Sequence, residues 1–336
     1  MREMTEARPE AAAAAPPLAM RILRALAESR EITLLLLVIL LALAMSLVYP
    51  ANFPTAANLR AVLLNLAPVG ILVCGMMLLM IGGTFDLSCG STLALAGVWA
   101  GVVSGWWHMP APLGVLAGLL VGVACGLING LIVTRIGINA LIATLGTLTI
   151  YRGLTYVTAG TGVTPISDAF AAYGRAVDPM FGLQSLFWAM LAVAAVLGWL
   201  VAETPFFRQY YFIGGNPRAA QLSGIRVGRM TLLAFTIMGF LGGLAGVLYA
   251  ARLNSAVVNA GVGIELKVIT ATVLGGASLK GGEGRILGGI LGVLFIALVE
   301  NAMIINRIGV FWQGIVVGLV LLFAVSLDRF KQTRRG

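Results

Sequence analysis

Charge is scarce in this sequence. Only 10% of its 336 residues are Asp, Glu, Lys or Arg, against roughly 25% in a soluble globular protein. Hydrophobic residues supply 60%, and the mean hydropathy is +0.99. Between Ile32 and Leu327 no polar block is long enough to fold as a separate domain. The composition excludes a soluble protein and predicts an all-α, polytopic integral membrane protein.

Residue types that carry catalysis or hold metal ions are also rare. The one histidine, His108, lies in an aromatic stretch at a predicted membrane edge, where aromatic belts occur. The three cysteines lie in apolar runs, without CxxC spacing and without a histidine nearby. We therefore expect no catalytic residue, no metal site and no disulfide framework.

A phosphate-binding motif is missing as well. The stretch GGASLKGGEGR at 275–285 has glycines and Lys280, but no Gly-Lys-Ser/Thr to cradle a nucleotide. The net charge is +9, but the basic residues lie in short segments between apolar runs, where they can set membrane topology. The sequence thus predicts no nucleic-acid partner.

The apolar runs predict about ten transmembrane helices. A helix needs roughly 20 apolar residues to cross the hydrocarbon core, because unpaired backbone groups there are too costly. Clear spans are 32–48, 61–81, 112–133, 185–202, 230–250, 286–305 and 310–327. Weaker segments, which could span or re-enter, are 91–106, 138–158 and 266–280.

Basic residues predict the orientation. The tail 1–31 mixes arginines and glutamates and is too long and acidic for a cleaved signal peptide, so we expect the first span to be retained. With ten spans and the N-terminus inside, sixteen Lys or Arg fall in inner segments, five in outer segments and one within a span. This distribution predicts cytoplasmic tails at 1–31 and 328–336 around a transmembrane domain at 32–327.

Glycines recur every four residues in the span at 112–133, from Gly114 to Gly130. Such stripes let helix backbones approach closely where no hydrophobic drive exists between helices. We expect the stripe to pack inside the chain, with a second copy of the protein as the alternative.

The longest basic segment within the membrane domain is the predicted cytoplasmic loop 203–229. Gly214 and Gly215 break the chain, Asn216 can cap a short helix with Pro217 at its first position, and Gly224 can end it. The pattern predicts a docking helix, with a solvated linker as the alternative.

Charges within the membrane domain are functional candidates, because a charge in hydrocarbon persists only when it is paired or hydrated. Asp86 precedes Ser88, an arrangement that suits either a helix cap or a contact with solute at a gate. Glu300 lies near the outer end of its span, where a structural role is sufficient. We therefore take Asp86 and Ser88 as candidates for a pathway or gate.

Arg152 is the third such charge, and it lies within the segment 138–158. Thr144, Thr147 and Tyr151 precede it at spacings that place their hydroxyls near one helix face. These four residues either line a polar pathway or serve structure, with an ion pair between Arg152 and Asp86 as one form of the second alternative.

Five stretches, taken in order, resemble motifs of one family. They are GGTFDLSCGSTLALAG at 82–97, LIATLGTLTIYRGLTYVTAG at 141–160, IGGNPRAAQLSGI at 213–225, TATVLGGASLKGGEGRILGGILG at 270–292 and FWQGIVVGLVLLFAVSLDR at 311–329. The set resembles the permeases of ribose- and galactose-type ABC importers, within the larger group that includes branched-chain amino acid permeases. The resemblance covers about residues 32–330.

The resemblance implies a permease that forms a homodimer in the bacterial inner membrane, surrounded by membrane lipid. It also implies an ATPase subunit with two nucleotide-binding halves, which holds ATP-Mg, and a periplasmic sugar-binding protein. The chain itself would be a transport subunit and no enzyme, without a cofactor of its own. The residues implied in coupling to the ATPase are Gly214, Gly215, Asn216, Pro217, Arg218, Ala219, Ala220, Leu222, Ser223 and Gly224.

Two other functions are weighed against this one. An ion-gradient-driven secondary transporter would favour acids near broken helices at the membrane midplane, and Asp86 keeps that alternative open. A membrane-embedded enzyme would need clustered His, Asp or Glu within the spans, which the sequence lacks. A pentose, a hexose, a sugar alcohol and a nucleoside all stay open as the solute.

Overall fold

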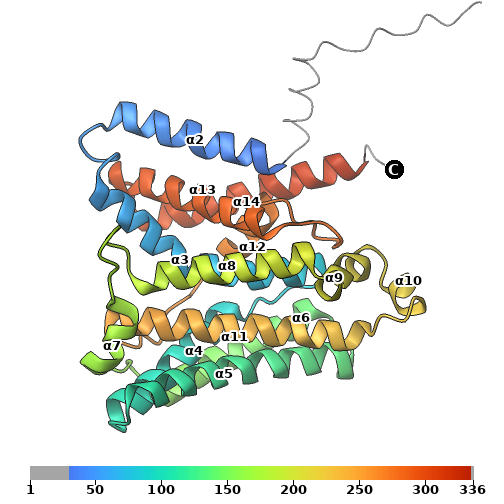
Figure 1. Ribbon diagram of the computed structural model, residues 1–336, viewed down its shortest axis with the longest axis horizontal. Helices are drawn as coiled ribbons and strands as arrows, with labels where there is room; N and C mark the ends of the chain where they lie inside the picture. The colour runs from blue at the N-terminus through green and yellow to red at the C-terminus, as the bar shows by residue number, and fades with distance from the viewer. Residues whose placement is uncertain (1–29, 334–336) are drawn as a thin grey trace, which may run out of the picture.

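The computed structural model describes residues 30–333, and long helices lie side by side along the longest axis of the molecule (Figure 1). Residues 1–29 and 334–336, which hold most of the predicted N-terminal tail and the end of the C-terminal one, lie outside the described residues. The helices that match the ten predicted segments are α2 (Arg30–Val48), α3 (Ala56–Ile81), α4 (Cys89–Gly101, continued by the π-helix η1, Val102–Trp106), α5 (Ala111–Leu131, continued by the π-helix η2, Ile132–Ile136), α6 (Ala140–Ala159), α8 (Ser185–Glu203), α11 (Val227–Leu253), α12 (Ile264–Leu274), α13 (Ile286–Ile305) and α14 (Val310–Thr333). Three shorter helices lie between them: α7 (Asp168–Arg175), α9 (Pro205–Gly215) and α10 (Pro217–Leu222).

Seven of the described helices are long and apolar enough to cross a membrane, judged by length and composition. They are α2, α3, α4 with η1, α5 with η2, α8, α11 and α13. Of the three weaker predicted segments, the first is among these seven, and the second forms α6, with 20 residues. The third forms α12, whose 11 residues extend about 16 Å and cannot cross a core of about 30 Å. The segment 266–280 is therefore too short to span as a helix, and the chain completes the crossing with the extended residues before α12.

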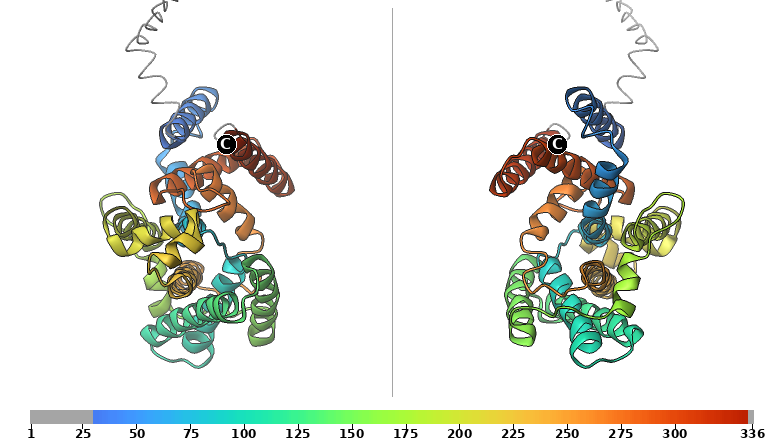
Figure 2. Two further views of the ribbon diagram at one scale, coloured as in Figure 1. Left: turned by 90° about the vertical axis from the view of Figure 1, so that its right-hand side faces the viewer. Right: turned by 90° about the vertical axis from the view of Figure 1, so that its left-hand side faces the viewer.

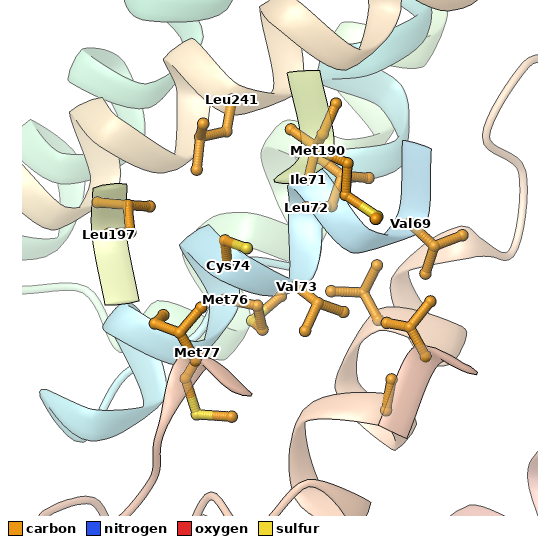
Figure 3. Close-up of a cluster of buried hydrophobic side chains, with 14 of the residues drawn as sticks. Val69, Ile71, Leu72, Val73, Cys74, Met76, Met77, Met190, Leu197 and Leu241 are labelled. Carbon is orange, nitrogen blue, oxygen red and sulfur yellow. The ribbon is translucent and has the colours of Figure 1, made fainter. Parts of the chain in front are cut away.

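Helix α3 is the centre of the packing. Its side chains are buried on every face from Leu66 to Ile81, because α8, α9, α11, α12 and α13 surround it. Figure 3 shows Cys74 and Met76 of α3 among side chains of α8 and α11, which include Leu197 and Leu241. A helix that is hydrophobic all round is expected to be buried in this way.

The glycine stripe of α5 packs against α11. A Cβ atom built at Gly122 would lie 2.5 Å from the carbonyl oxygen of Gly239, and one built at Gly126 would lie 2.2 Å from that of Phe235. The two backbones are therefore in direct contact, which explains why the stripe needs residues without side chains. The prediction that the stripe packs within the chain is confirmed.

Two groups of four helices have the same order and opposite directions. The first group is α3 to α6 and the second is α11 to α14; α3 ends, and α11 begins, at the end of the molecule where α10 lies (Figure 1). Helix α11 packs on α4 and α5 as α3 packs on α12 and α13, and α6 packs on α4 as α14 packs on α12. The chain thus has an inverted internal arrangement.

Candidate functional site

Two helices begin inside the membrane domain rather than at one of its surfaces. Helix α4 begins after the segment 82–88, and α12 begins after the segment 254–263. A Cβ atom built at Gly90 would lie 2.3 Å from the carbonyl oxygen of Gly261 and 2.8 Å from Cγ2 of Ile264. The first turn of α4 therefore touches the backbone just before α12, with no room for a side chain between them.

The segment that leads to α12 runs along α4. A Cβ atom at Gly101 would lie 2.8 Å from Cβ of Ala256, whereas Gly90 meets Gly261. Gly90 and Gly101 are about 16 Å apart along a helix, so the chain from 256 to 261 descends α4 almost to its start. Ala256 is fixed at the other end by two backbone hydrogen bonds with Val163, of 2.9 and 3.0 Å. We call 254–263, where the chain turns back into the membrane domain after α11, the re-entrant segment.

Asp86 lies in a buried polar network at the start of α4. Its carboxylate accepts hydrogen bonds from the N–H and the hydroxyl of Ser88, both at 2.7 Å, and from the side-chain amide of Asn129 at 3.3 Å. The Tyr151 hydroxyl lies 3.1 Å from Oδ1 of Asn129 and 3.0 Å from the carbonyl oxygen of Cys125. The network ties the segment 82–88 to α5 and α6.

Of the six predicted pathway residues, three meet in this network: Asp86, Ser88 and Tyr151. Thr144 and Thr147 are buried, and their hydroxyls donate to carbonyl oxygens of their own helix, those of Ala140 and Thr144. These bonds make the two threonines part of the α6 packing. Contact of these five residues, Asp86, Ser88, Thr144, Thr147 and Tyr151, with solute stays a prediction.

Arg152 points to a different place. Its Nη1 atom donates to the carbonyl oxygens of Val258 and Ala260, at 2.8 and 2.9 Å. The side chain is partly buried and holds the re-entrant segment against α6. Because Ser88 and Asn129 occupy the Asp86 carboxylate, the structure does not form the hypothesised ion pair between Arg152 and Asp86.

Sequence reasoning missed two polar residues of this region. Asn129 interrupts the apolar run of α5, and an amide within a span is a signal under the same rule that singled out Asp86. Glu265 is in the first turn of α12, and its Oε2 atom lies 2.9 Å from the Cβ position of Gly90. Its segment was expected to begin at 266, so its place within the membrane domain was not recognised.

Glu300 pairs with Lys267. Its Oε1 atom lies 2.6 Å from the ammonium nitrogen of Lys267, so this ion pair joins α13 to α12. The structural role expected for Glu300 agrees with this geometry.

The loop 203–229 forms the short helix that its pattern predicts. Oδ1 of Asn216 accepts hydrogen bonds from the N–H groups of Arg218 and Ala219 at 3.1 and 3.0 Å, and Pro217 is the first residue of α10. Gly224 has a φ angle of +87°, as expected just beyond a helix end. Helix α10 protrudes at one end of the molecule (Figure 1).

The faces of α10 differ from expectation in one respect. Ala220 is only 4% exposed, because it packs into the hydrophobic core of this chain, whereas Leu222 is 85% exposed. Both residues were predicted to take part in docking to the ATPase. A partner surface would meet Leu222 directly, and Ala220 only through a rearrangement.

Three chain segments meet where α9 ends. A Cβ atom at Gly214 would lie 2.0 Å from the carbonyl oxygen of Ile81 and 2.3 Å from the nitrogen of Gly282, and the N–H of Gly282 donates to that same oxygen at 2.9 Å. A Cβ atom at Gly281 would lie 2.7 Å from Cα of Gly83. We call these contacts the glycine junction. It joins the end of α9 to the segment before α4 and to the loop after α12.

These features define a class of protein. Inverted groups of helices, each with a helix that begins within the membrane, are typical of membrane transport proteins. The family described as "Branched-chain amino acid transport system / permease component" matches residues 58–325. The chain belongs to this family of integral membrane permease components, as its resemblance implied.

Curated relatives of known name match most of the chain. The L-arabinose transport system permease protein AraH of Escherichia coli (strain K12) is 40% identical over 290 residues, or 85% of this chain and 86% of that protein. The ribose import permease protein RbsC of Haemophilus influenzae is 38% identical over 89% of this chain and 93% of its own length. The autoinducer 2 import system permease protein LsrC of Klebsiella pneumoniae is 33% identical over 91% and 88%. No solved structure matches.

Proposed function

We propose that this chain is the membrane subunit of an ATP-driven importer of a monosaccharide or a similar small solute. Relatives named for L-arabinose, ribose and autoinducer 2 support import of a small polar solute. The observation that carries the proposal is the capped, protruding α10, joined by the glycine junction to the segments of both broken helices. An ATPase subunit with two nucleotide-binding halves would bind at α10, on the cytoplasmic side.

Transmission from α10 is short. Only Gly215 and Asn216 separate α10 from Gly214, which lies against the end of α3 and against Gly282 in the loop 275–285. Packed backbones move as a unit, because a core of native density deforms little. A displacement of α10 by nucleotide binding would therefore move the segment before α4 and the loop after α12 together.

A second copy of the chain would cover the face that carries α6 and α14, which lie on the same side of the molecule (Figure 2). Glycines on both helices face open space: Gly146 and Gly153 on α6, Gly314 and Gly318 on α14. Arg152 is partly exposed beside them, and a charge that faces lipid there would cost at least about 2.5 kcal/mol. Two copies with these faces together would enclose a hydrated path. A periplasmic binding protein would deliver solute to its outer end.

Reconstitution in proteoliposomes tests the proposal. The permease would be purified with its cognate ATPase and binding protein, and uptake of L-arabinose and D-ribose would be measured with and without ATP on the α10 side. We expect uptake that requires ATP and that persists after ionophores collapse the ion gradients. Uptake that stops with the ionophores and continues without ATP would establish the secondary transporter instead.

A further inference from the structure

A cavity of about 300 Å³ lies between α3, α4, α11 and α12. Its polar wall consists of Asn65 of α3, Tyr249 and Arg252 of α11 and Lys267 of α12. Arg252 is next to the last residue of α11, a helix whose first residue follows the α10 loop. The cavity is therefore in the half of the molecule opposite α10, which the proposed orientation places toward the outside of the cell.

The wall combines hydrogen-bonding groups with apolar surface. The Lys267 ammonium is bound to Glu300, and Nη1 of Arg252 donates to the carbonyl oxygen of Leu64 at 3.2 Å. Each cation is thus anchored by one contact and has further N–H groups to offer, while the Asn65 amide can both donate and accept. The ring of Tyr249 adds a flat apolar surface with a hydroxyl at its edge.

These groups fit a neutral molecule with many hydroxyls. The volume is at the lower end of the roughly 300–1,000 Å³ of ligand pockets, which suits a monosaccharide better than a larger solute. The charge of Lys267 is balanced by Glu300, so one positive group, Arg252, is left in the wall. A few separate donors with one aromatic ring would hold such a solute weakly, as rapid release requires.

The inner end of the cavity is formed by the re-entrant segment. Residues 261–264 line it, and Gly261 and Gly263 have φ angles of +69° and +78°, which only glycine adopts readily. On its far side the same segment is held by Arg152 through the carbonyl oxygens of Val258 and Ala260. The segment thus separates the cavity from the start of α4.

We infer that this cavity is a loading site for a neutral, hydroxyl-rich solute of monosaccharide size, closed on the inner side by the re-entrant segment. The inference rests on the proposed function and adds to it a site within one copy of the chain. Solute would enter the cavity from the outside and bind there against the re-entrant segment. Movement of the segment away from Gly90 would then connect the site with the hydrated path between the two copies.

Thiol labelling tests the site. Val262 lines the cavity and is 69% exposed, and the natural cysteines Cys74, Cys89 and Cys125 are buried, so Val262→Cys supplies the accessible thiol. Right-side-out vesicles with the full complex would be treated with a membrane-impermeant thiol reagent, with and without L-arabinose or D-ribose. We expect labelling from the outside that the transported sugar slows severalfold. The matched control is Met180→Cys, which is 81% exposed outside the cavity and should be labelled without protection.

Two results would overturn the inference: no labelling of Val262→Cys from the outside, or labelling that no transported sugar slows. Uptake in the same vesicles distinguishes failure of the site from failure of the proposed function. Normal ATP-dependent uptake, when sugar does not protect Val262→Cys from labelling, rejects the site and leaves the proposed function standing. A second measurement uses Tyr249→Phe, which keeps the ring and removes the hydroxyl. We expect a severalfold higher KM for uptake with little change in kcat, and no change in Tyr173→Phe, whose ring is on α7 outside the cavity. An unchanged KM in Tyr249→Phe would also count against the site.

Discussion

The backbone of Gly261 occupies the place that a side chain at Gly90 would need. Only 2.3 Å separates the Cβ position at Gly90 from the carbonyl oxygen of Gly261. We predict that Gly90→Ala displaces the re-entrant segment and abolishes uptake, with a loss of stability of about 1–3 kcal/mol, as in overpacked cores. Thermal unfolding and uptake measure both effects. Gly228→Ala, at a helical glycine in open space, is the control and should behave like the wild type.

Arg152 and Asp86 should contribute independently. Their side chains bind different groups, the re-entrant carbonyls in one case and Ser88 with Asn129 in the other. Each single change to Ala should reduce stability, because it leaves buried groups without partners. The double variant should show the sum of the two losses within about 0.5 kcal/mol. A double variant much more stable than this sum would show coupling between the two residues that the contacts do not indicate.

Gly214 and Gly215 should respond differently to the same substitution. Alanine at Gly214 places its Cβ 2.0 Å from a carbonyl oxygen, whereas nothing lies within 4 Å of a Cβ at Gly215. We expect Gly214→Ala to assemble with the ATPase and hydrolyse ATP, yet to lose stimulation of hydrolysis by solute. Gly215→Ala should retain it. Equal activity of both variants would mean that the glycine junction does not transmit motion.

Leu222 and Ala220 should separate docking from folding. Leu222→Asp places a charge at an exposed position, so the permease should unfold at an unchanged temperature but lose affinity for the ATPase. Ala220→Trp overfills a buried position and should lower the unfolding temperature by itself. Co-purification with the ATPase and thermal unfolding are the two measurements. Normal assembly of Leu222→Asp would show that α10 is a linker.

Asp178 should stabilise its loop above acidic pH. Its carboxylate accepts N–H groups of Phe181 at 2.6 Å, Leu183 at 2.9 Å and Met180 at 2.9 Å, and the indole N–H of Trp188. The bond from Phe181, followed by the others, holds the pKa of Asp178 below its usual value. The pKa of Asp178 in the folded protein is lower than its value of about 3.9 in the unfolded chain. The folded state therefore gains stability at pH values above about 3.9, and it loses this stability as the pH falls through the folded-state pKa.

Tryptophan fluorescence in detergent can follow this change, since Trp188 donates to the titrating group. We expect a transition with its midpoint below the usual pKa of an aspartate. Asp178→Asn should lack it. A midpoint at or above the usual value would contradict the hydrogen-bond pattern.

Much of the fold follows from local sequence signals. The lengths of the apolar runs predict the positions of the long helices, and the Asn-Pro pair after two glycines predicts α10. Both signals are local, because span length and helix capping depend on residues that are neighbours in the sequence. The inverted arrangement was not found in the sequence, because it consists of helix order and packing rather than of repeated residues. The buried face of α10 was also unpredictable, since six residues are too few to show a periodic apolar face.

The candidate site was only partly predictable, for a related reason. Asp86 and Arg152 stand out because charge is rare within the membrane domain. The hydrogen-bond partners of Arg152 are backbone carbonyl groups, which every residue has. The residue types in the sequence therefore do not indicate where these partners are. The contact of Gly90 with Gly261 is likewise between backbones far apart in the sequence, and only the folded chain brings them together.

The glycine junction separates recognition from movement. Its contacts are between backbones, and the side chains of α10 that face outward take no part in them. A substitution on the outer face of α10 can therefore change which ATPase is recognised and leave the mechanical link intact. One membrane subunit could acquire a new ATPase partner through changes in a few exposed residues. Exchange of the outer face of α10 between two such importers should therefore exchange the ATPase subunits that they bind.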